Sequence, residues 1–269
     1  MNSRTSPRQE PEDHAQRLAV LIDADNAQAA VIEGLLAEIA TFGEATVKRI
    51  YGDFTSPASG QWKKVLNRYA IKPVQQFAYT TGKNATDSTM IIDAMDLLYT
   101  RRFDGFCLVS SDSDFTGLAL RIREEGLMVL GFGEKKTPDA FRNACHKFVF
   151  TELLRSLPEK PASGKAAAPA RGAGAERVEA APVEDVPGEP EELPLAHFLR
   201  ALDQASDDEG WAQLSSFGNY LTKLQPEFDP RLYGFKKLSD LVHARRDIFE
   251  VEDRAPAGAR GKALYVRRK

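Results

Sequence analysis

The stretch Val109-Ser110-Ser111-Asp112-Ser113-Asp114-Phe115 decides how the rest of the chain is interpreted. It follows the apolar run Phe106–Val109. It leads into a helical pattern with spacing i, i+3, i+4 and i+7, made of Phe115, Leu118, Ala119 and Ile122. The pattern predicts a buried strand that ends in two carboxylates at the start of a packed helix. In parallel α/β sheets, such strand ends border the crevices where ligands bind.

The same arrangement occurs near the start of the chain, where the apolar run Leu18–Ile22 ends in Asp23-Ala24-Asp25-Asn26. Two acidic strand ends in one sheet predict a shared site. Asp114 has a second interpretation, as the N-cap of the helix that follows, because Asp favours that position. We expect no such capping role for Asp112.

Composition and charge indicate an ordinary protein with room for two domains. The chain has 269 residues, of which 42% are hydrophobic and 28% charged, with a formal net charge of -3. A global charge of this size does not indicate a nucleic-acid partner. Cys107 and Cys145 form neither a disulfide framework nor a zinc-binding pattern, so we expect a reducing, cytoplasmic setting.

No apolar run approaches the roughly 20 residues that a membrane-spanning helix needs, so we expect no membrane association. The polar segment 1–16 lacks the hydrophobic region of a signal peptide and is expected to be a disordered leader.

Residues 17–158 alternate short apolar runs with amphipathic ones, which predicts a three-layer α/β domain with a mostly parallel sheet. The expected strands are Leu18–Asp23, Thr46–Tyr51, Lys72–Tyr79, Phe106–Ser110, Leu127–Gly131 and Lys147–Phe150. The expected helices are Gln28–Thr41, Gln61–Tyr69, Asp87–Tyr99 and Phe115–Glu125.

Asp87 begins the third of these helices on the same face as Met90, Ile91 and Ala94. An acid in the first turn is favoured by the helix dipole whichever way it points, so a capping role stands beside a functional one. An acid on the buried face needs a partner, because burying an unpaired carboxylate is costly. Asp93 and Asp96 lie off that face and are expected to be solvated or paired in salt bridges.

Residues 159–192 contain 18 Ala, Pro and Gly among 34 residues and no aromatic residue, which predicts a flexible, disordered linker. Residues 193–269 regain three helical patterns followed by two strand-like runs, Ile248–Val251 and Ala263–Val266. That order predicts a small winged helix-turn-helix domain. Its basic residues near the third helix and the wing suggest contacts with phosphates: Lys236, Lys237, Arg245, Arg246, Arg267 and Arg268. A packing or dimerisation domain without a nucleic-acid ligand is the alternative.

The acids Asp23, Asp87, Asp112 and Asp114 would repel one another strongly if they met at one edge of a sheet. A hard divalent cation, Mg²⁺ or Mn²⁺, would relieve this repulsion and is the metal that oxygen ligands select. Such an ion can activate water and neutralise charge on a phosphodiester. The four histidines lie outside the expected site, so nucleophilic catalysis with a histidine base has no support.

Three ordered motifs carry a resemblance to a known family. LIDADN (21–26), NATDSTMIIDAMDLL (84–98) and LVSSDSDF (108–115), followed by EEGLMVLGFG (124–133), resemble the NYN domain, a Rossmannoid branch of the PIN-like nuclease superfamily. The resemblance implies that Asp23, Asp87, Asp112 and Asp114 hold a catalytic metal and that Asn26 belongs to the site. Asp25 and Asp93 match the family pattern less closely.

The later stretch GWAQLSSFGNYLTKLQPEFDPRLYGFKKLSDLV (210–242), with FEV and YVRR after it, resembles the OST-HTH or LOTUS domain. That resemblance implies RNA binding. The two resemblances together imply a metal-dependent ribonuclease whose RNA is recruited by residues 193–269.

Two alternatives stay open: an RNA-binding adaptor with weak or no catalysis, and a haloacid-dehalogenase-like phosphatase with Asp23 as nucleophile. The phosphatase pattern fails at Ala27 and leaves Asp87 without a role. The second domain would also suit a protein partner, and the oligomeric state is not predicted. Trp62, Lys63, Lys64 and Lys83 are further candidates for nucleic-acid contact, although Trp62 fits a core position and the lysines fit a solvated surface.

Overall fold

The structure is a computed structural model that describes residues 15–55, 60–76, 85–155, 193–254 and 262–269. The disorder expected for the leader and for the linker concerns residues outside this part of the chain, apart from residues 15 and 16, and Lys83 also lies outside it. No helix in the described residues is both long enough and apolar enough to cross a membrane.

Six parallel strands form the sheet of the first domain, in the order β3-β2-β1-β4-β5-β6. Their bounds are β1 Arg17–Asp23, β2 Glu44–Gly52, β3 Lys72–Gln75, β4 Gly105–Val109, β5 Met128–Gly133 and β6 Lys147–Phe150. Central strands are buried on both faces, as their unbroken apolar runs require. In the register, Ile22 lies opposite Val109, so β1 and β4 end side by side.

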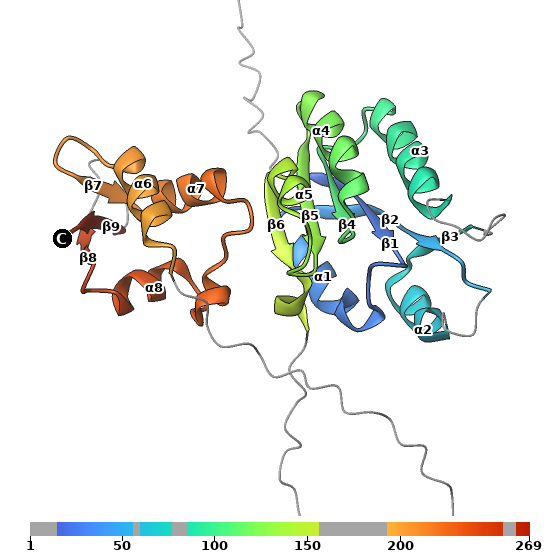
Figure 1. Ribbon diagram of the computed structural model, residues 1–269, viewed down its shortest axis with the longest axis horizontal. Coiled ribbons are helices and arrows are strands. Elements are labelled where there is room, and N and C mark those ends of the chain that lie inside the picture. The colour runs from blue at the N-terminus through green and yellow to red at the C-terminus, as the bar shows by residue number, and fades with distance from the viewer. Residues whose placement is uncertain (1–14, 56–59, 77–84, 156–192, 255–261) are drawn as a thin grey trace, which may run out of the picture.

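Helices cover both faces of this sheet (Figure 1), which confirms the three-layer α/β prediction. One core contains residues of α3 (Ala85–Tyr99), α4 (Thr116–Glu124) and α5 (Asp139–Ala144). The other contains residues of α1 (Ile32–Ile39), α2 (Gly60–Tyr69) and the 3-10 segments η1 (Ala29–Val31) and η4 (Thr151–Leu154). Short 3-10 segments precede α1 and α4, the second being η3 (Ser113–Phe115).

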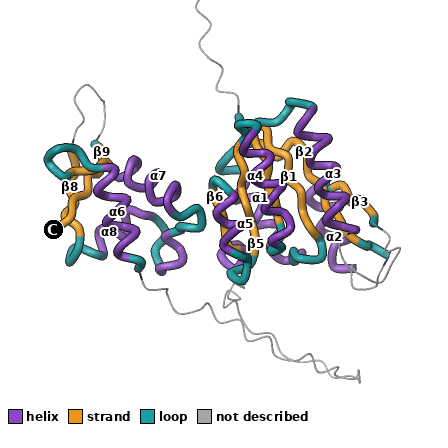
Figure 2. Tube along the Cα trace, turned by 45° about the horizontal axis from the view of Figure 1, so that its top comes forward, coloured by secondary structure: helices purple, strands orange, loops and turns teal. Residues whose placement is uncertain are grey.

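The second domain contains α6 (Leu195–Ala205), α7 (Leu214–Leu224), the 3-10 segment η5 (Pro230–Tyr233) and α8 (Leu238–Ala244). Its antiparallel sheet has the order β7-β9-β8, with β7 Trp211–Gln213, β8 Phe249–Arg254 and β9 Ala263–Arg268. Figure 2 shows its helices packed together beside this sheet. Phe198 lies at the centre of the core, with the Phe217 and Phe249 ring centroids 6.0 and 6.3 Å from its own.

Candidate functional site

The predicted acids come from three places in the chain. Asp23 is the last residue of β1, Asp112 and Asp114 follow β4, and Asp87 lies in the first turn of α3. Because β1 and β4 are adjacent and parallel, their carboxyl ends meet at one edge of the sheet. Asp87, Asp112 and Asp114 each offer a carboxylate oxygen, and these oxygens lie within 4.8 Å of one another. We call these three residues the acid cluster.

Asp23 is placed differently, because its side chain is fully buried and its oxygens are bound by the protein. Asn26 Nδ2 and Ser110 Oγ both donate to Asp23 Oδ2, at 2.7 and 2.8 Å, and the Asp25 amide donates to Oδ1 at 3.0 Å. Burial raises the pKa of Asp23, and the hydrogen bonds from Asn26 and Ser110 oppose that rise. The structure therefore places Asp23 next to the acid cluster but outside the three converging carboxylates.

Ser110 is a site residue that sequence reasoning missed. Its hydroxyl donates to Asp23 and accepts the Asp112 amide at 3.1 Å, so it joins the ends of β1 and β4. Ser111 beside it accepts the Glu134 amide at 2.9 Å and ties β4 to the end of β5. The only available signal was their position, directly after a buried strand.

The expectation that Asp112 has no capping role was wrong, and the alternative role of Asp114 as an N-cap does not apply either. Asp112 is the N-cap of η3, and its Oδ1 accepts the Asp114 amide at 3.0 Å, whereas Asp114 lies inside η3 and its side chain is exposed. A 3-10 turn separates the strand from α4, so the cap falls two residues earlier than an α-helix starting at Phe115 would place it. Asp112 therefore both fixes the turn and supplies a carboxylate oxygen to the acid cluster.

The pKa of Asp87 is raised by burial and by the negative charges around it. Burial and the neighbouring charges of Asp23, Asp112 and Asp114 raise the pKa of Asp87 from 3.8 to about 6. Its carboxyl group thus binds a proton in the folded chain at pH values where the unfolded chain has lost it. The repulsion is present fully once the pH exceeds the folded pKa.

This raised pKa predicts that Asp87→Asn stabilises the metal-free protein above pH 6. An acid with a raised pKa favours folding below its unfolded pKa, and that contribution is lost as the pH rises through the folded pKa. After allowance for solvent screening, we expect a gain of about 1 kcal/mol, or roughly 2–4 °C in Tm, at pH 8. Thermal melts in EDTA at pH 4 and pH 8 test this. Asp96→Asn, on the same helix but outside the acid cluster, should show no such pH-dependent gain.

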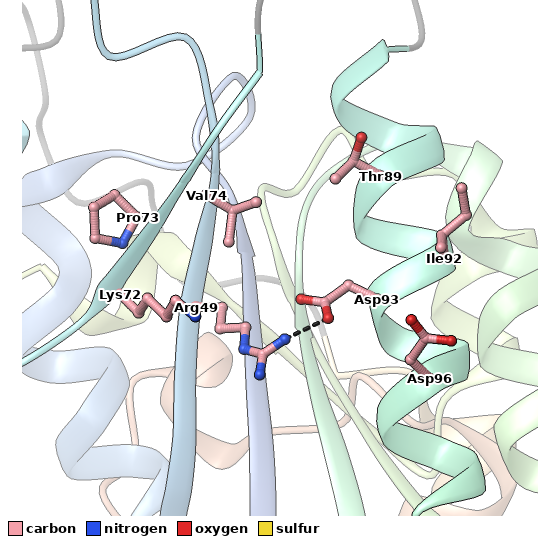
Figure 3. A pocket seen from close by; sticks show the side chains of 8 residues that line it. All are labelled: Arg49, Lys72, Pro73, Val74, Thr89, Ile92, Asp93 and Asp96. Carbon is pink, nitrogen blue, oxygen red and sulfur yellow. Dashed lines mark hydrogen bonds and ion pairs between the residues drawn. The ribbon is translucent and has the colours of Figure 1, made fainter.

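Asp93 occupies a separate polar contact on α3, close to β2. Arg49 and the Tyr51 hydroxyl both donate hydrogen bonds to its carboxylate, and Figure 3 shows Arg49 reaching across from β2 toward Asp93. The prediction of a salt-bridged Asp93 is therefore confirmed, and Asp96 is exposed as expected. The contacts of Asp93 with Arg49 and Tyr51 hold α3, the helix that carries Asp87, against β2.

The predicted phosphate-binding residues divide into two groups. Lys236, Lys237, Arg246 and Arg268 are exposed, and none of them has an ion pair within the described part of the chain. We call these four residues the exposed cations. Arg245, by contrast, pairs with Asp247 at 2.9 Å.

Arg267 also has a structural role, because it pairs with Glu250 at 2.6 Å and lies 4.6 Å from the Trp211 ring centroid. Arg254 lies 4.1 Å from the centroid of the same ring. Arg254 of β8 and Arg267 of β9 therefore both pack on Trp211 of β7 and hold these three strands together. In the first domain, Trp62 is buried in the core and Lys63 and Lys64 are exposed on α2.

Comparison with known proteins finds two families. The family model of the NYN domain matches residues 17–154, and that of the OST-HTH/LOTUS domain matches residues 194–258. No curated protein matches the chain.

Similar solved structures cover one part of the chain each. An uncharacterised Nitrosomonas europaea protein, solved by NMR, is 51% identical and covers 35% of this chain and 91% of its own, with a TM-score of 0.30. A Vibrio parahaemolyticus protein of unknown function is 21% identical, covering 52% of this chain and 96% of its own, with a TM-score of 0.44. A Chromobacterium violaceum protein is 30% identical, covering 31% and 87%, with a TM-score of 0.24.

Proposed function

Because the chain belongs to the NYN domain family and carries an OST-HTH/LOTUS domain after its α/β domain, we propose that it is a metal-dependent ribonuclease. The observation that carries this proposal is the acid cluster, in which three carboxylates from two parts of the chain converge at the carboxyl edge of the sheet. The reaction would be hydrolysis of RNA phosphodiesters, with RNA bound by the second domain.

The acid cluster suits a hard divalent cation such as Mg²⁺ or Mn²⁺. All its donors are carboxylate oxygens, which these ions prefer. Oxygens that share one Mg²⁺ lie at most about 4 Å apart. The three oxygens within 4.8 Å of one another would need only small side-chain rotations, which the exposed Asp114 permits. Asp87, Asp112 and Asp114 would hold the ion directly, and the same charges that raise the pKa of Asp87 would attract it.

When bound, the cation would activate a water molecule and neutralise charge that builds on the phosphodiester. Residues around the acid cluster would fix the positions of the carboxylates that hold the cation. Ser110 joins Asp23 to the Asp112 backbone, and Asn26 fixes the Asp23 carboxylate, so the negative charge behind the acid cluster is held in one place. Arg49 and Tyr51 hold Asp93, and through α3 they would keep Asp87 directed at its two partners.

The arrangement of Asp23 does not favour a phosphatase that uses this residue as a nucleophile. A nucleophilic carboxylate must reach the phosphorus of its substrate, whereas the Asp23 side chain is fully buried and both of its oxygens accept hydrogen bonds. The acid Asp87 would also have no task in that reaction. The arrangement fits a fixed negative charge behind a metal site better.

We expect the purified protein to cleave RNA with Mn²⁺ or Mg²⁺ and to be inactive in EDTA. Labelled single-stranded RNA, structured RNA and DNA should be compared, with a small phosphate monoester as a fourth substrate. Cleavage of RNA with little phosphate release from the monoester is the expected pattern. Tight RNA binding without cleavage under any metal condition would instead identify an adaptor, and rapid monoester turnover would identify a phosphatase.

A further inference from the structure

The segment Pro226–Arg231, between α7 and α8, lies against the first domain, and we call it the docking segment. The Phe148 amide of β6 donates to the Pro226 carbonyl at 2.9 Å. The Lys147 ammonium donates to the Phe228 carbonyl at 2.5 Å. β6 is an edge strand, and the docking segment satisfies a backbone donor there that would otherwise face solvent.

Two ion pairs cross the same contact, and the second domain supplies the base in one pair and the acid in the other. Arg231 of the docking segment donates to both oxygens of Glu38 on α1, at 2.9 and 3.1 Å. Arg142 on α5 reaches Glu227 at 3.3 Å in the other direction. Both carboxylates are largely buried, with side chains 19% and 14% exposed, so they are better protected from screening than surface pairs.

Apolar packing continues through the contact. Phe228 of the docking segment is 3% exposed, and its ring centroid lies 5.3 Å from that of Phe198 in the core of the second domain. The buried side chains of α3, α4, α5 and β6 and those of the second domain belong to one continuous cluster. Figures 1 and 2 both place the second domain on the β6 side of the sheet.

We propose that the two domains act as one rigid unit, joined by the docking segment on the edge of β6. The docking segment complements that edge in three ways at once: a backbone acceptor for Phe148, a carbonyl for Lys147, and side chains of opposite charge for Glu38 and Arg142. The partner of this edge is thus the chain's own second domain.

In the rigid unit, the docking contact lies at a fixed distance from the acid cluster. Its meaning for RNA cleavage rests on the proposed function. Lys147 begins β6, whereas Asp112 and Asp114 of the acid cluster follow the carboxyl end of β4, and β5 lies between β4 and β6. Two strand spacings are about 10 Å, and a five-residue strand is about 17 Å long. The docking contact therefore lies roughly 20 Å from the acid cluster and leaves the carboxyl edge of the sheet uncovered.

Amide hydrogen exchange of the full chain, measured by NMR, tests the docking without requiring any catalytic activity. The Phe148 amide should exchange slowly in the unaltered protein, because it donates its hydrogen bond to the Pro226 carbonyl. The double variant E38R/E227R turns both cross-domain ion pairs into like-charge contacts. We expect it to speed exchange at Phe148 at least about tenfold and to increase the radius of gyration in small-angle scattering.

The matched control is E33R/D203R, which makes the same charge changes at exposed positions of α1 and α6. It should leave Phe148 protected, and amides of the central strand β1 should stay protected in both variants, which shows that the fold is intact. Rapid exchange of Phe148 in the unaltered protein, or slow exchange in E38R/E227R, would overturn the proposal. RNA cleavage is measured separately, so a failed docking and a failed nuclease assay are distinguishable.

Discussion

Asp112→Asn should abolish the rise in Tm that Mn²⁺ or Mg²⁺ produces and should slow RNA cleavage at least about 100-fold. A cation present at 100 times its Kd stabilises the native protein by about 2.7 kcal/mol. Removing one of the three converging carboxylates would take away one of the ligands that we propose for that ion. The Asn side chain keeps an oxygen that can accept the Asp114 amide, so η3 should remain capped. The loss should therefore concern metal and not the fold.

The measurement is a metal titration followed by differential scanning fluorimetry, with cleavage of labelled RNA in parallel. Asp96→Asn is the matched control, because it removes an exposed acid on α3 outside the acid cluster. It should keep both the metal-induced rise and the cleavage rate. An undiminished metal response in Asp112→Asn would show that the ion binds elsewhere.

The second large effect is expected on RNA affinity. Replacing the four exposed cations, Lys236, Lys237, Arg246 and Arg268, with alanine should weaken RNA binding roughly 100-fold at low salt. For single strands, each lost phosphate contact lowers the slope of log affinity against log salt by about 0.7, so four lost contacts lower it by roughly 3. Fluorescence anisotropy over a series of salt concentrations measures both quantities.

The control for this experiment replaces four exposed basic residues of the first domain, Lys63, Lys64, Arg68 and Lys72. It changes the net charge equally and should leave most of the affinity intact. Arg267→Ala should behave differently from both, because that side chain packs on Trp211 and pairs with Glu250, and its loss should lower Tm. If the exposed cations prove dispensable, the second domain suits a protein partner instead.

The sheet could be predicted because each central strand is buried on both faces and therefore appears as an unbroken apolar run. The run Lys147–Phe150 has the predicted bounds, and the other strands differ from prediction mainly at their ends. The helix Asp139–Ala144 was missed, because six residues are too few to establish a helical period. β7 was missed for the same reason, since it has only three residues.

The candidate site was less predictable, because its details depend on contacts across the sheet. Strand ends drew attention to Asp112 and Asp114 and the start of a helix to Asp87, and their carboxylate oxygens lie within 4.8 Å of one another. The sequence could not show that Asp23 is sealed by Asn26 and Ser110. Likewise, Arg267 has no acidic neighbour in the sequence and was therefore predicted to contact RNA. Its partner Glu250 is 17 residues away and lies beside it only because of the register of β8 and β9.

The covered edge of β6 has a consequence for how the two domains can be studied apart. Without the second domain, the Phe148 amide and the ammonium of Lys147 would lose their carbonyl partners, and the apolar cluster that the first domain shares with the second would be partly exposed to water. An uncovered edge strand presents unpaired backbone groups that can pair with the same edge of another molecule. A shortened chain that ends near residue 155 would thus be prone to aggregate through β6, and a drop in its activity would reflect self-association as much as lost RNA binding.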